Sequence, residues 1–297
     1  MAELLSERPD PRRRFRELLA GPETIVAPGA FDAMSARLVE QAGFPAVYMT
    51  GFGVTASLLG RPDVGLLTMT DMASAARRIV SAVDVPVIAD ADTGYGNAVN
   101  VIRTVQEYEA AGVAALHIED QVAPKRCGHM SGKQVVPADV MVDRVRAAVA
   151  ARRDPDLVII ARSDAVAPEG LDAAIDRVRR YRDAGADLLF LDALPSEGDI
   201  ERVAAELAGE PVLFSWGDGG LTPPTELDQV RRWGFRTVIF PVSTLLAAVS
   251  AVQDVLAEIK RDGTPVNAMK HLPHLGAFFD IVGLDEINQL AERFGNG

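Results

Sequence analysis

Acidic side chains recur where apolar runs of the sequence come to an end. There are four such places in the sequence: VPVIAD is followed by ADTGYG, LHIE is followed by DQ, LVIIARS is followed by DA, and LLFL is followed by DA. The acidic residues at these ends are Asp90, Asp92, Glu119, Asp120, Asp164 and Asp192. Carboxylates gathered at one rim repel one another unless a cation lies among them, and hard oxygen ligands suit Mg²⁺ or Mn²⁺. The pattern predicts a metal site that includes Asp92 and Glu119; the alternative is that Asp120 and Asp164 are helix caps.

The single thiol of the chain, Cys127, lies in a polar segment at residues 119–136, EDQVAPKRCGHMSGKQVV. Lys125, Arg126 and His129 surround it in sequence, and two glycines give the segment hinge freedom. Cations near a thiol favour its thiolate and make proton transfer at neutral pH feasible. A lone cysteine is more often an inert buried hydrophobe, but this segment offers no apolar core around it. We therefore predict a functional thiol.

Two connections are much longer than the roughly 2–6 residues that most loops between a strand and a helix need. One is the thiol segment, and the other runs from Thr50 to Thr70 with the sequences TGFG and RPDVG. Long loops at a catalytic rim are typical of lids. Neither TGFG nor TGYG has the spacing of a phosphate-binding loop, which argues against a nucleotide cofactor. His117, inside an apolar run, is interpreted as a packing or supporting residue.

Short apolar runs alternate with amphipathic stretches along the chain. The runs predict strands near 24–27, 46–49, 85–89, 114–118, 157–161, 187–191, 211–214 and 237–240. The stretches between them predict helices near 32–42, 71–82, 98–111, 137–152, 170–184, 197–208, 223–233 and 243–261. Several helices end at a glycine suited to a left-handed cap, at Gly43, Gly112, Gly185 and Gly234. This alternation favours an α/β fold of the (β/α)₈ barrel type, with a doubly wound open sheet as the alternative.

In such a barrel, active sites lie at the carboxyl ends of the strands, which is where the acidic residues fall. We expect one barrel domain over residues 1–297, with a polar tail at 1–14 and a C-terminal helical extension at 265–297. The extension is too apolar to remain in water, so we expect it to cover a neighbouring subunit. Its apolar side chains include Phe278, Phe279, Ile281, Val282, Leu284, Ile287 and Leu290.

Charge and composition exclude several classes of protein. The 297 residues include 30 basic and 42 acidic side chains, which gives a net charge of −12. The only dense basic cluster is Arg12, Arg13 and Arg14, so nucleic acid is excluded as the main partner. One cysteine allows no internal disulfide. No apolar run is long enough for a membrane span, and the polar N-terminus lacks the order of a signal peptide, so we expect a cytoplasmic protein.

Five segments together resemble the isocitrate lyase and phosphoenolpyruvate mutase superfamily. They are PGAFDAMSARL, DADTGYGN, HIEDQ, KRCGH and ARSDA, in this order, and the likeness extends from about Phe15 to Phe294. The chain is most similar to the short branch with methylisocitrate lyase, dimethylmalate lyase and carboxyphosphonoenolpyruvate phosphonomutase. KRCGH is the most specific element, because the carbon–carbon lyases of the family use that cysteine as a proton donor and the simple mutases lack it.

The resemblance implies a role for each matching residue. Mg²⁺, or Mn²⁺ in its place, would be held by Asp90, Asp92 and Glu119. Catalytic roles fall to Cys127, Arg162, Lys125 and His129. Substrate-binding roles fall to Thr50, Gly51, Phe52, Asp63, Gly128, Asp192, Ser215 and Asp218. The resemblance also implies a homotetramer in which paired subunits exchange the C-terminal helix.

Two positions depart from the usual family pattern. Asp192 stands where the family usually has Glu, and Ser215-Trp216-Gly217-Asp218 replaces an Asn-x-x-Glu pattern. Both positions contact the part of the substrate distal to the metal, which puts the usual substrates in doubt.

The prediction is therefore a Mg²⁺-dependent carbon–carbon lyase. It would cleave a substituted, malate-like 2-hydroxy acid to pyruvate or glyoxylate and a carboxylic acid. The alternatives are a phosphonomutase acting on carboxyphosphonoenolpyruvate, an oxaloacetate hydrolase or decarboxylase, and a non-enzymatic sensor of 2-oxo acids.

Overall fold

The protein is a closed barrel of eight parallel strands in sequential order, β1 to β8. A computed structural model describes residues 4–5, 8–128 and 130–295. The strands are β1 (Ile25–Ala30), β2 (Val47–Met49), β3 (Val87–Asp90), β4 (Ala115–Glu119), β5 (Val158–Ser163), β6 (Leu188–Leu191), β7 (Val212–Ser215) and β8 (Thr237–Phe240). β8 pairs with β1 and closes the barrel. The expected (β/α)₈ barrel is confirmed, and the open sheet is excluded.

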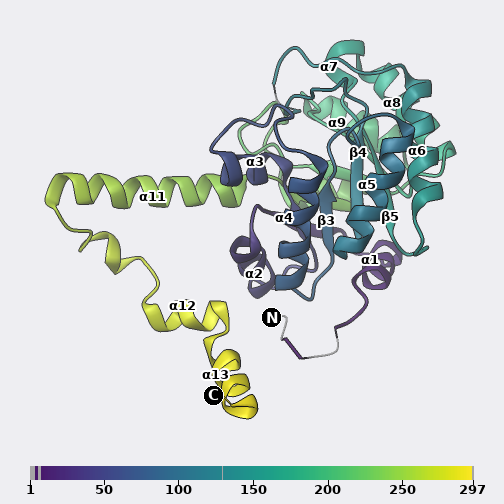
Figure 1. Ribbon diagram of the computed structural model, residues 1–297. Helices are drawn as coiled ribbons and strands as arrows, with labels where there is room; N and C mark the ends of the chain where they lie inside the picture. The colour runs from purple at the N-terminus through teal and green to yellow at the C-terminus, as the bar shows by residue number, and fades with distance from the viewer. Residues whose placement is uncertain (1–3, 6–7, 129, 296–297) are drawn as a thin grey trace.

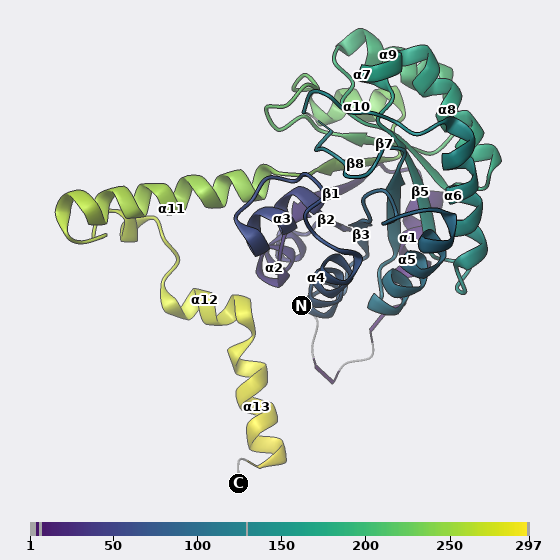
Figure 2. The ribbon, with the colours of Figure 1, turned by 45° about the horizontal axis from the view of Figure 1, so that its top comes forward.

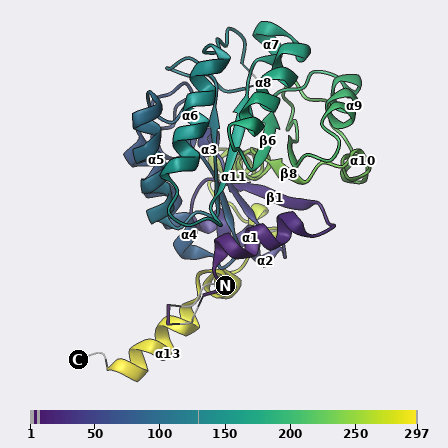
Figure 3. The same ribbon diagram turned by 90° about the vertical axis from the view of Figure 1, so that its right-hand side faces the viewer.

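Helices cover the outside of the barrel (Figure 1). They are α2 (Ala33–Gln41), α4 (Met69–Ala82), α5 (Ala98–Ala111), α6 (Ala138–Ala151), α8 (Leu171–Asp183), α9 (Glu197–Glu206) and α10 (Leu227–Trp233). Capping residues set their ends: Asn97 begins α5 with a capping box, and Gly112 ends it in the left-handed region at a φ of 89°. Figure 3 shows α5, α6 and α8 next to one another on the outer layer.

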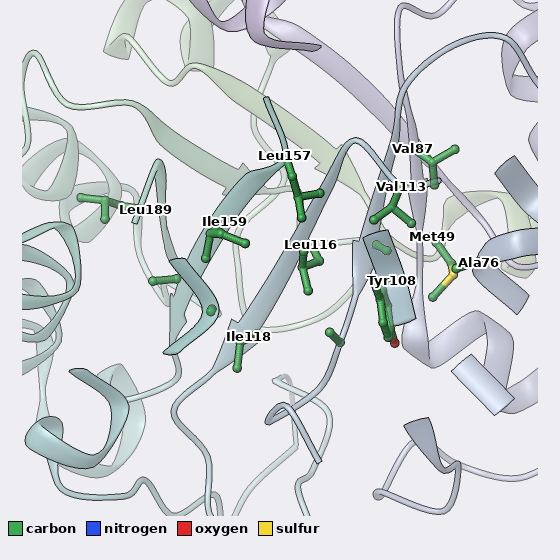
Figure 4. Packing of buried hydrophobic residues seen from close by; sticks show 14 of the residues in the cluster. Met49, Ala76, Val87, Tyr108, Val113, Leu116, Ile118, Leu157, Ile159 and Leu189 are labelled. Carbon is green, nitrogen blue, oxygen red and sulfur yellow. The ribbon is translucent and has the colours of Figure 1, made fainter. Parts of the chain in front are cut away.

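Side-chain alternation along the strands divides the core into two layers and positions the site. On β4, Leu116 and Ile118 point outward to the helices, and Figure 4 shows them among the buried residues of that layer. The inward layer includes Ile88, Ile160, Phe190 and Leu213. Because strand side chains alternate with a period of two, the next inward positions are Asp90, Arg162, Asp192 and Ser215. The same apolar rows that close the barrel therefore carry polar side chains into its carboxyl-terminal mouth.

The amino-terminal end of the barrel is closed by a helix that begins within the expected tail. α1 (Pro11–Ala20) begins at the cap Asp10, so residues 11–14 are helical and not part of a tail. Phe15 is fully buried with the inner layer of the barrel. Arg12 and Arg16 fix the helix through ion pairs with Asp154 at 3.0 Å and Asp187 at 2.9 Å. A second helix, α3 (Gly51–Leu59), lies in the connection that we expected to be a lid loop.

The last helical stretch does not complete the outer layer. α11 (Ser243–Asp262) begins against β1, where the Thr244 hydroxyl donates to the Gly29 carbonyl at 2.6 Å, and then projects away from the barrel (Figures 1 and 2). A short 3₁₀ turn (Ala268–Lys270), α12 (Leu275–Val282) and α13 (Leu284–Phe294) follow it. The expectation that 243–261 forms the eighth barrel helix was wrong. We call residues 243–295 the C-terminal arm.

The arm leaves much of its apolar surface uncovered within one chain. Val252 is 57% exposed, Leu256 58%, Leu275 72% and Phe294 67%. The arm returns to the barrel at α2, where the Arg37 side chain donates to the Ile281 carbonyl at 3.1 Å. Within the described residues, no helix is both long enough and apolar enough to cross a membrane.

Candidate active site

A cavity of about 260 Å³ opens at the carboxyl ends of the strands. Its lining brings together predicted residues from six parts of the chain, at or after strands β2 to β7. These are Thr50, Phe52, Asp63, Asp90, Lys125, Cys127, Gly128, Arg162, Asp192, Ser215 and Asp218. His129 lies outside the described residues, so its predicted role remains a prediction.

Asp90 and Asp92 are held by backbone groups at the end of β3. One oxygen of Asp90 accepts from the Asp92 N–H at 2.9 Å, and the other accepts from the Gly51 N–H at 3.2 Å. A Cβ at Gly51 would lie 2.4 Å from the Asp90 carboxylate, so only glycine allows this approach. Asp92 has a φ of 46°, a strained conformation that functional sites often retain. Both carboxylates are thereby fixed at the mouth.

Glu119, at the end of β4, is fully buried, and neither of its oxygens has a hydrogen-bond partner in the described part of the chain. Its nearest cation is Arg162, with Nε at 3.4 Å. Burial raises the pKa of Glu119 well above its usual value, and Arg162 offsets part of the effect. Burial also raises the pKa of Asp92 to about 6, against the opposing influence of Lys125. For both carboxylates the effect of burial on the pKa is larger than the opposing effect of the nearby cation.

The described residues contain no group of three acidic, histidine or cysteine side chains already arranged to hold a metal ion. Instead, Lys125 lies between two carboxylates, with Nζ 2.6 Å from Asp63 and 2.8 Å from Asp92. Burial lowers the pKa of Lys125, but Asp92 and Glu119 raise it more, and the pKa lies well above its usual value. Lys125 is therefore a fixed cation at neutral pH.

Arg162 forms the second cationic centre. Its Nε donates to Asp164 at 2.8 Å, and its Nη2 donates to Asp192 at 2.5 Å. The guanidinium carbon lies 5.1 Å from the centre of the Phe190 ring. These contacts fix the orientation of the buried, planar Arg162 guanidinium, which lines the cavity.

The segment that carries Cys127 closes over this cationic centre. The Cys127 N–H donates to the Asp63 carbonyl at 3.1 Å, and the residue is half-buried in the cavity lining. A Cβ at Gly128 would lie 1.6 Å from Asp192 Oδ2, so the backbone there lies directly against that carboxylate. The buried Lys133 ammonium donates to both the Gly128 carbonyl and Asp164. We call residues 121–136 the thiol loop.

Asp120 and Asp164, two of the predicted rim carboxylates, lie outside the cavity lining and hold neighbouring residues in place. Asp120 accepts from the Ser163 hydroxyl at 2.7 Å, the Asp164 N–H at 2.8 Å and the Tyr181 hydroxyl at 2.8 Å. Asp164 binds Arg162 and Lys133. Neither residue caps a helix, because the N-cap residue of α6 is Pro137 and that of the short α7 (Val166–Glu169) is Ala165. The capping alternative for Asp120 and Asp164 was therefore wrong.

The side chains of Thr50 and Asp218 accept hydrogen bonds at the starts of helices, and both residues also line the cavity. The Thr50 hydroxyl accepts from the Gly53 N–H at 3.2 Å and caps α3. The Asp218 carboxylate accepts from the Val242 N–H at 2.9 Å and from the Ser243 hydroxyl, and so holds the start of α11. Asp218 has a φ of 29°, which indicates local strain in the loop after β7.

Several lining residues were not singled out from the sequence. Tyr48 lies two positions before Thr50 on β2, and its hydroxyl is 2.9 Å from His117 Nε2. The rings of Tyr48 and His117 stack at 5.8 Å, and burial lowers the pKa of His117 to about 4, which supports the packing interpretation of this histidine. The alternation of side chains along β2 could have placed Tyr48 on the same side of the strand as Thr50. Phe190, Trp216 and Leu246 also line the cavity and gave no such signal beyond their apolar character.

Comparison with known proteins identifies the family. The model of the phosphoenolpyruvate phosphomutase family matches residues 15–260. A 2,3-dimethylmalate lyase from Eubacterium barkeri is 44% identical over 96% of this chain and 98% of its own length. The structure of an oxaloacetate acetylhydrolase bound to the inhibitor 3,3-difluorooxalacetate is 37% identical, with a TM-score of 0.92 over 98% of this chain and 99% of its own.

A third relative was solved with a metal ion. The structure of a phosphonopyruvate hydrolase in complex with oxalate and Mg²⁺ is 32% identical, with a TM-score of 0.87 over 96% of this chain and 99% of that one. The resemblance inferred from the five sequence segments is thus confirmed. The chain belongs to the phosphoenolpyruvate phosphomutase family and is an enzyme related to the lyases of that family.

Proposed function

We propose that the protein is a carbon–carbon lyase acting on a substituted malate. It would release pyruvate or glyoxylate together with a carboxylic acid. The observation that carries this proposal is the position of Cys127 in one cavity with Asp90, Asp63 and the guanidinium of Arg162. A proton donor and a charge-stabilising group on the same small cavity are what cleavage to a carbanion requires.

We further propose that Mg²⁺ binds at Asp90, Asp92 and Glu119. The residues fit such an ion because the two oxygens of buried Glu119 have no hydrogen-bond partner among the described residues, and because all three donors are hard carboxylate oxygens. The Mg²⁺ of the related phosphonopyruvate hydrolase supports the choice of ion. When bound, the ion supplies Lewis-acid stabilisation of negative charge on substrate oxygens.

The residues of the chain then have separate tasks. Arg162 binds a substrate carboxylate and stabilises charge that develops on it. Lys125 keeps Asp63 and Asp92 in place through its two short ion pairs. As the bond between C2 and C3 breaks, the C2 hydroxyl becomes the carbonyl of the 2-oxo acid and gives its proton to a carboxylate of the cavity lining. The electron pair of the broken bond stays on C3, and the Cys127 thiol gives C3 a proton. The thiol loop, held through Gly128 and Lys133, excludes water from that carbanion.

A product screen tests the proposed activity. With Mg²⁺ present, 2,3-dimethylmalate and 2-methylmalate should release pyruvate, measured with a coupled dehydrogenase. Parallel incubations contain oxaloacetate, followed by oxalate release, and carboxyphosphonoenolpyruvate, followed by phosphorus NMR. Oxalate formation or a new phosphorus–carbon signal, without cleavage of any malate, would replace the lyase by a hydrolase or by a phosphonomutase.

We also propose that the C-terminal arm packs on another copy of the chain, within a homotetramer. The supporting observation is the row of exposed apolar side chains on the arm, including Val252, Leu256, Leu275 and Phe294. Packing on a second copy with closed symmetry would bury these side chains in every subunit.

Light scattering tests the assembly. We expect a particle of about four chains of 31.7 kDa each at micromolar concentration. Replacing Val252 and Leu256 together by glutamate should dissociate it, because both apolar side chains would be buried against the partner. A monodisperse monomer of the unaltered protein would contradict the proposal.

A further inference from the structure

The cavity has two chemically different sides. One side, at the ends of β3, β4 and β5, contains Asp90, Lys125 and Arg162. The other side is formed by the ends of β7 and β8 and the start of α11. It presents Trp216, Ile239, Pro241, Val242 and Leu246. Phe52 from α3 and Phe190 from β6 lie on the lining as well.

The side chains of the apolar side are held in place by contacts within the protein. The Trp216 ring stacks on Phe240 at 5.5 Å between ring centres, and its Nε1 donates to the Thr225 carbonyl at 2.8 Å. The polar edge of the indole is therefore already satisfied within the protein, and the ring contributes apolar area to the cavity. The Asp218 carboxylate fixes Val242 and the first turn of α11, which places Leu246.

The distribution of charge separates the two sides further. Lys125 and Arg162 are the cations of the described lining, and both are engaged with carboxylates. The side of Trp216 and Leu246 has one charged group, the acidic Asp218, and the neutral hydroxyl of Ser215. A carboxylate on this side of the cavity would meet no described cation and would be repelled by Asp218.

We propose that the substrate carries an apolar group larger than methyl on C3, and that this group packs against Phe52, Trp216, Val242 and Leu246. This inference rests on the proposed lyase function and specifies its substrate class, a 2-hydroxy dicarboxylic acid with an alkyl or aromatic C3 substituent. A substrate with a third carboxylate at this position is disfavoured. Each added methylene buried here should raise kcat/KM about fourfold.

A matched pair of substrates isolates the effect of charge. The series is 2-methylmalate bearing methyl, isobutyl, benzyl or carboxymethyl on C3, the last compound being 2-methylisocitrate. Isobutyl and carboxymethyl have nearly the same shape and differ in charge. With pyruvate release as the readout, the isobutyl compound should exceed the methyl compound at least about tenfold in kcat/KM. It should exceed the carboxymethyl compound about 10²-fold, because that charge would be left unpaired.

The outcomes distinguish this inference from the proposed function. Cleavage of the methyl or carboxymethyl compound at least as fast as the isobutyl compound would overturn the apolar subsite and leave the lyase standing. Release of pyruvate from none of the compounds would overturn a lyase that forms pyruvate, and this inference with it.

A charge introduced on the apolar side gives a second test. Leu246→Arg should raise the carboxymethyl-to-isobutyl ratio of kcat/KM about tenfold, by offering the third carboxylate a partner. The ratio is measured on one preparation, so it does not depend on the folded fraction. Val99→Arg puts the same charge at an exposed apolar position of α5 outside the lining and should leave the ratio unchanged. An unchanged ratio in Leu246→Arg would contradict the assignment of this surface to the C3 substituent.

Discussion

Replacing Cys127 by alanine should lower turnover of the malate substrate about 10²–10⁴-fold, the usual worth of a positioned acid. The thiol is expected to protonate C3, because the other protonated group of the thiol loop in the described lining, the Lys125 ammonium, is held in ion pairs with Asp63 and Asp92. Affinity for the 2-oxo acid product should change little, because Asp90, Lys125 and Arg162 stay in place. Steady-state kinetics and calorimetric titration with pyruvate in the presence of Mg²⁺ measure the two quantities separately.

Ser131→Ala is the matched control for this experiment. Ser131 lies on the same thiol loop, is exposed and lines no part of the cavity, so its loss should leave turnover within about twofold. If Cys127→Ala were also within a few-fold of the unaltered enzyme, the thiol would not be the proton donor. Phosphorus migration needs no such proton, so that result would favour the phosphonomutase.

Removing the metal should abolish activity, with a loss of about 10³-fold or more, since the ion is expected to contribute several kcal/mol of charge stabilisation. EDTA should produce this loss, and added Mg²⁺ should reverse it. Asp92→Ala should show the same loss in the presence of Mg²⁺. Thermal unfolding gives a readout independent of turnover: Mg²⁺ should raise the Tm of the unaltered protein and have no effect on the Tm of Asp92→Ala.

Asp143→Ala controls for the removal of one negative charge. Asp143 lies on α6, where its side chain is 68% exposed and 3.7 Å from Arg146, and it does not line the cavity. This variant should keep both its activity and its Tm response to Mg²⁺. Full activity of the unaltered enzyme in EDTA would rule out the assignment of Asp90, Asp92 and Glu119 to a metal.

Much of the barrel could be predicted from the sequence because two local signals agree. Buried parallel strands read as short apolar runs, and glycines such as Gly112 and Gly234 mark the preceding helix ends through left-handed caps. α11 was misplaced because an amphipathic pattern shows that one face of a helix is buried, without showing what buries it. α3 was missed because TGFG reads as a turn, although Thr50 makes it a capped helix start.

The sequence predicts which types of residue form the candidate site, but it predicts less well which of them form ion pairs with one another. Strand alternation alone brings Asp90, Glu119 and Arg162 into the barrel mouth. The sequence does not show which cation each carboxylate meets, because partners such as Lys125 and Asp63 are far apart along the chain and come within 2.6 Å only in the fold. Asp120 likewise looked like a rim ligand until its bonds to Ser163 and Tyr181 were seen.

We expect this cavity to break a bond between carbons and the thiol to protonate the resulting carbanion. Turnover of 2,3-dimethylmalate with Mg²⁺ in D₂O, followed by proton NMR and mass spectrometry of the products, tests this reaction. It should give equal amounts of pyruvate and propionate, with one deuterium on C2 of the propionate, because the exchanged thiol delivers a deuteron. Propionate without deuterium at C2, or an intact substrate under conditions in which the protein is folded and loaded with Mg²⁺, would contradict it.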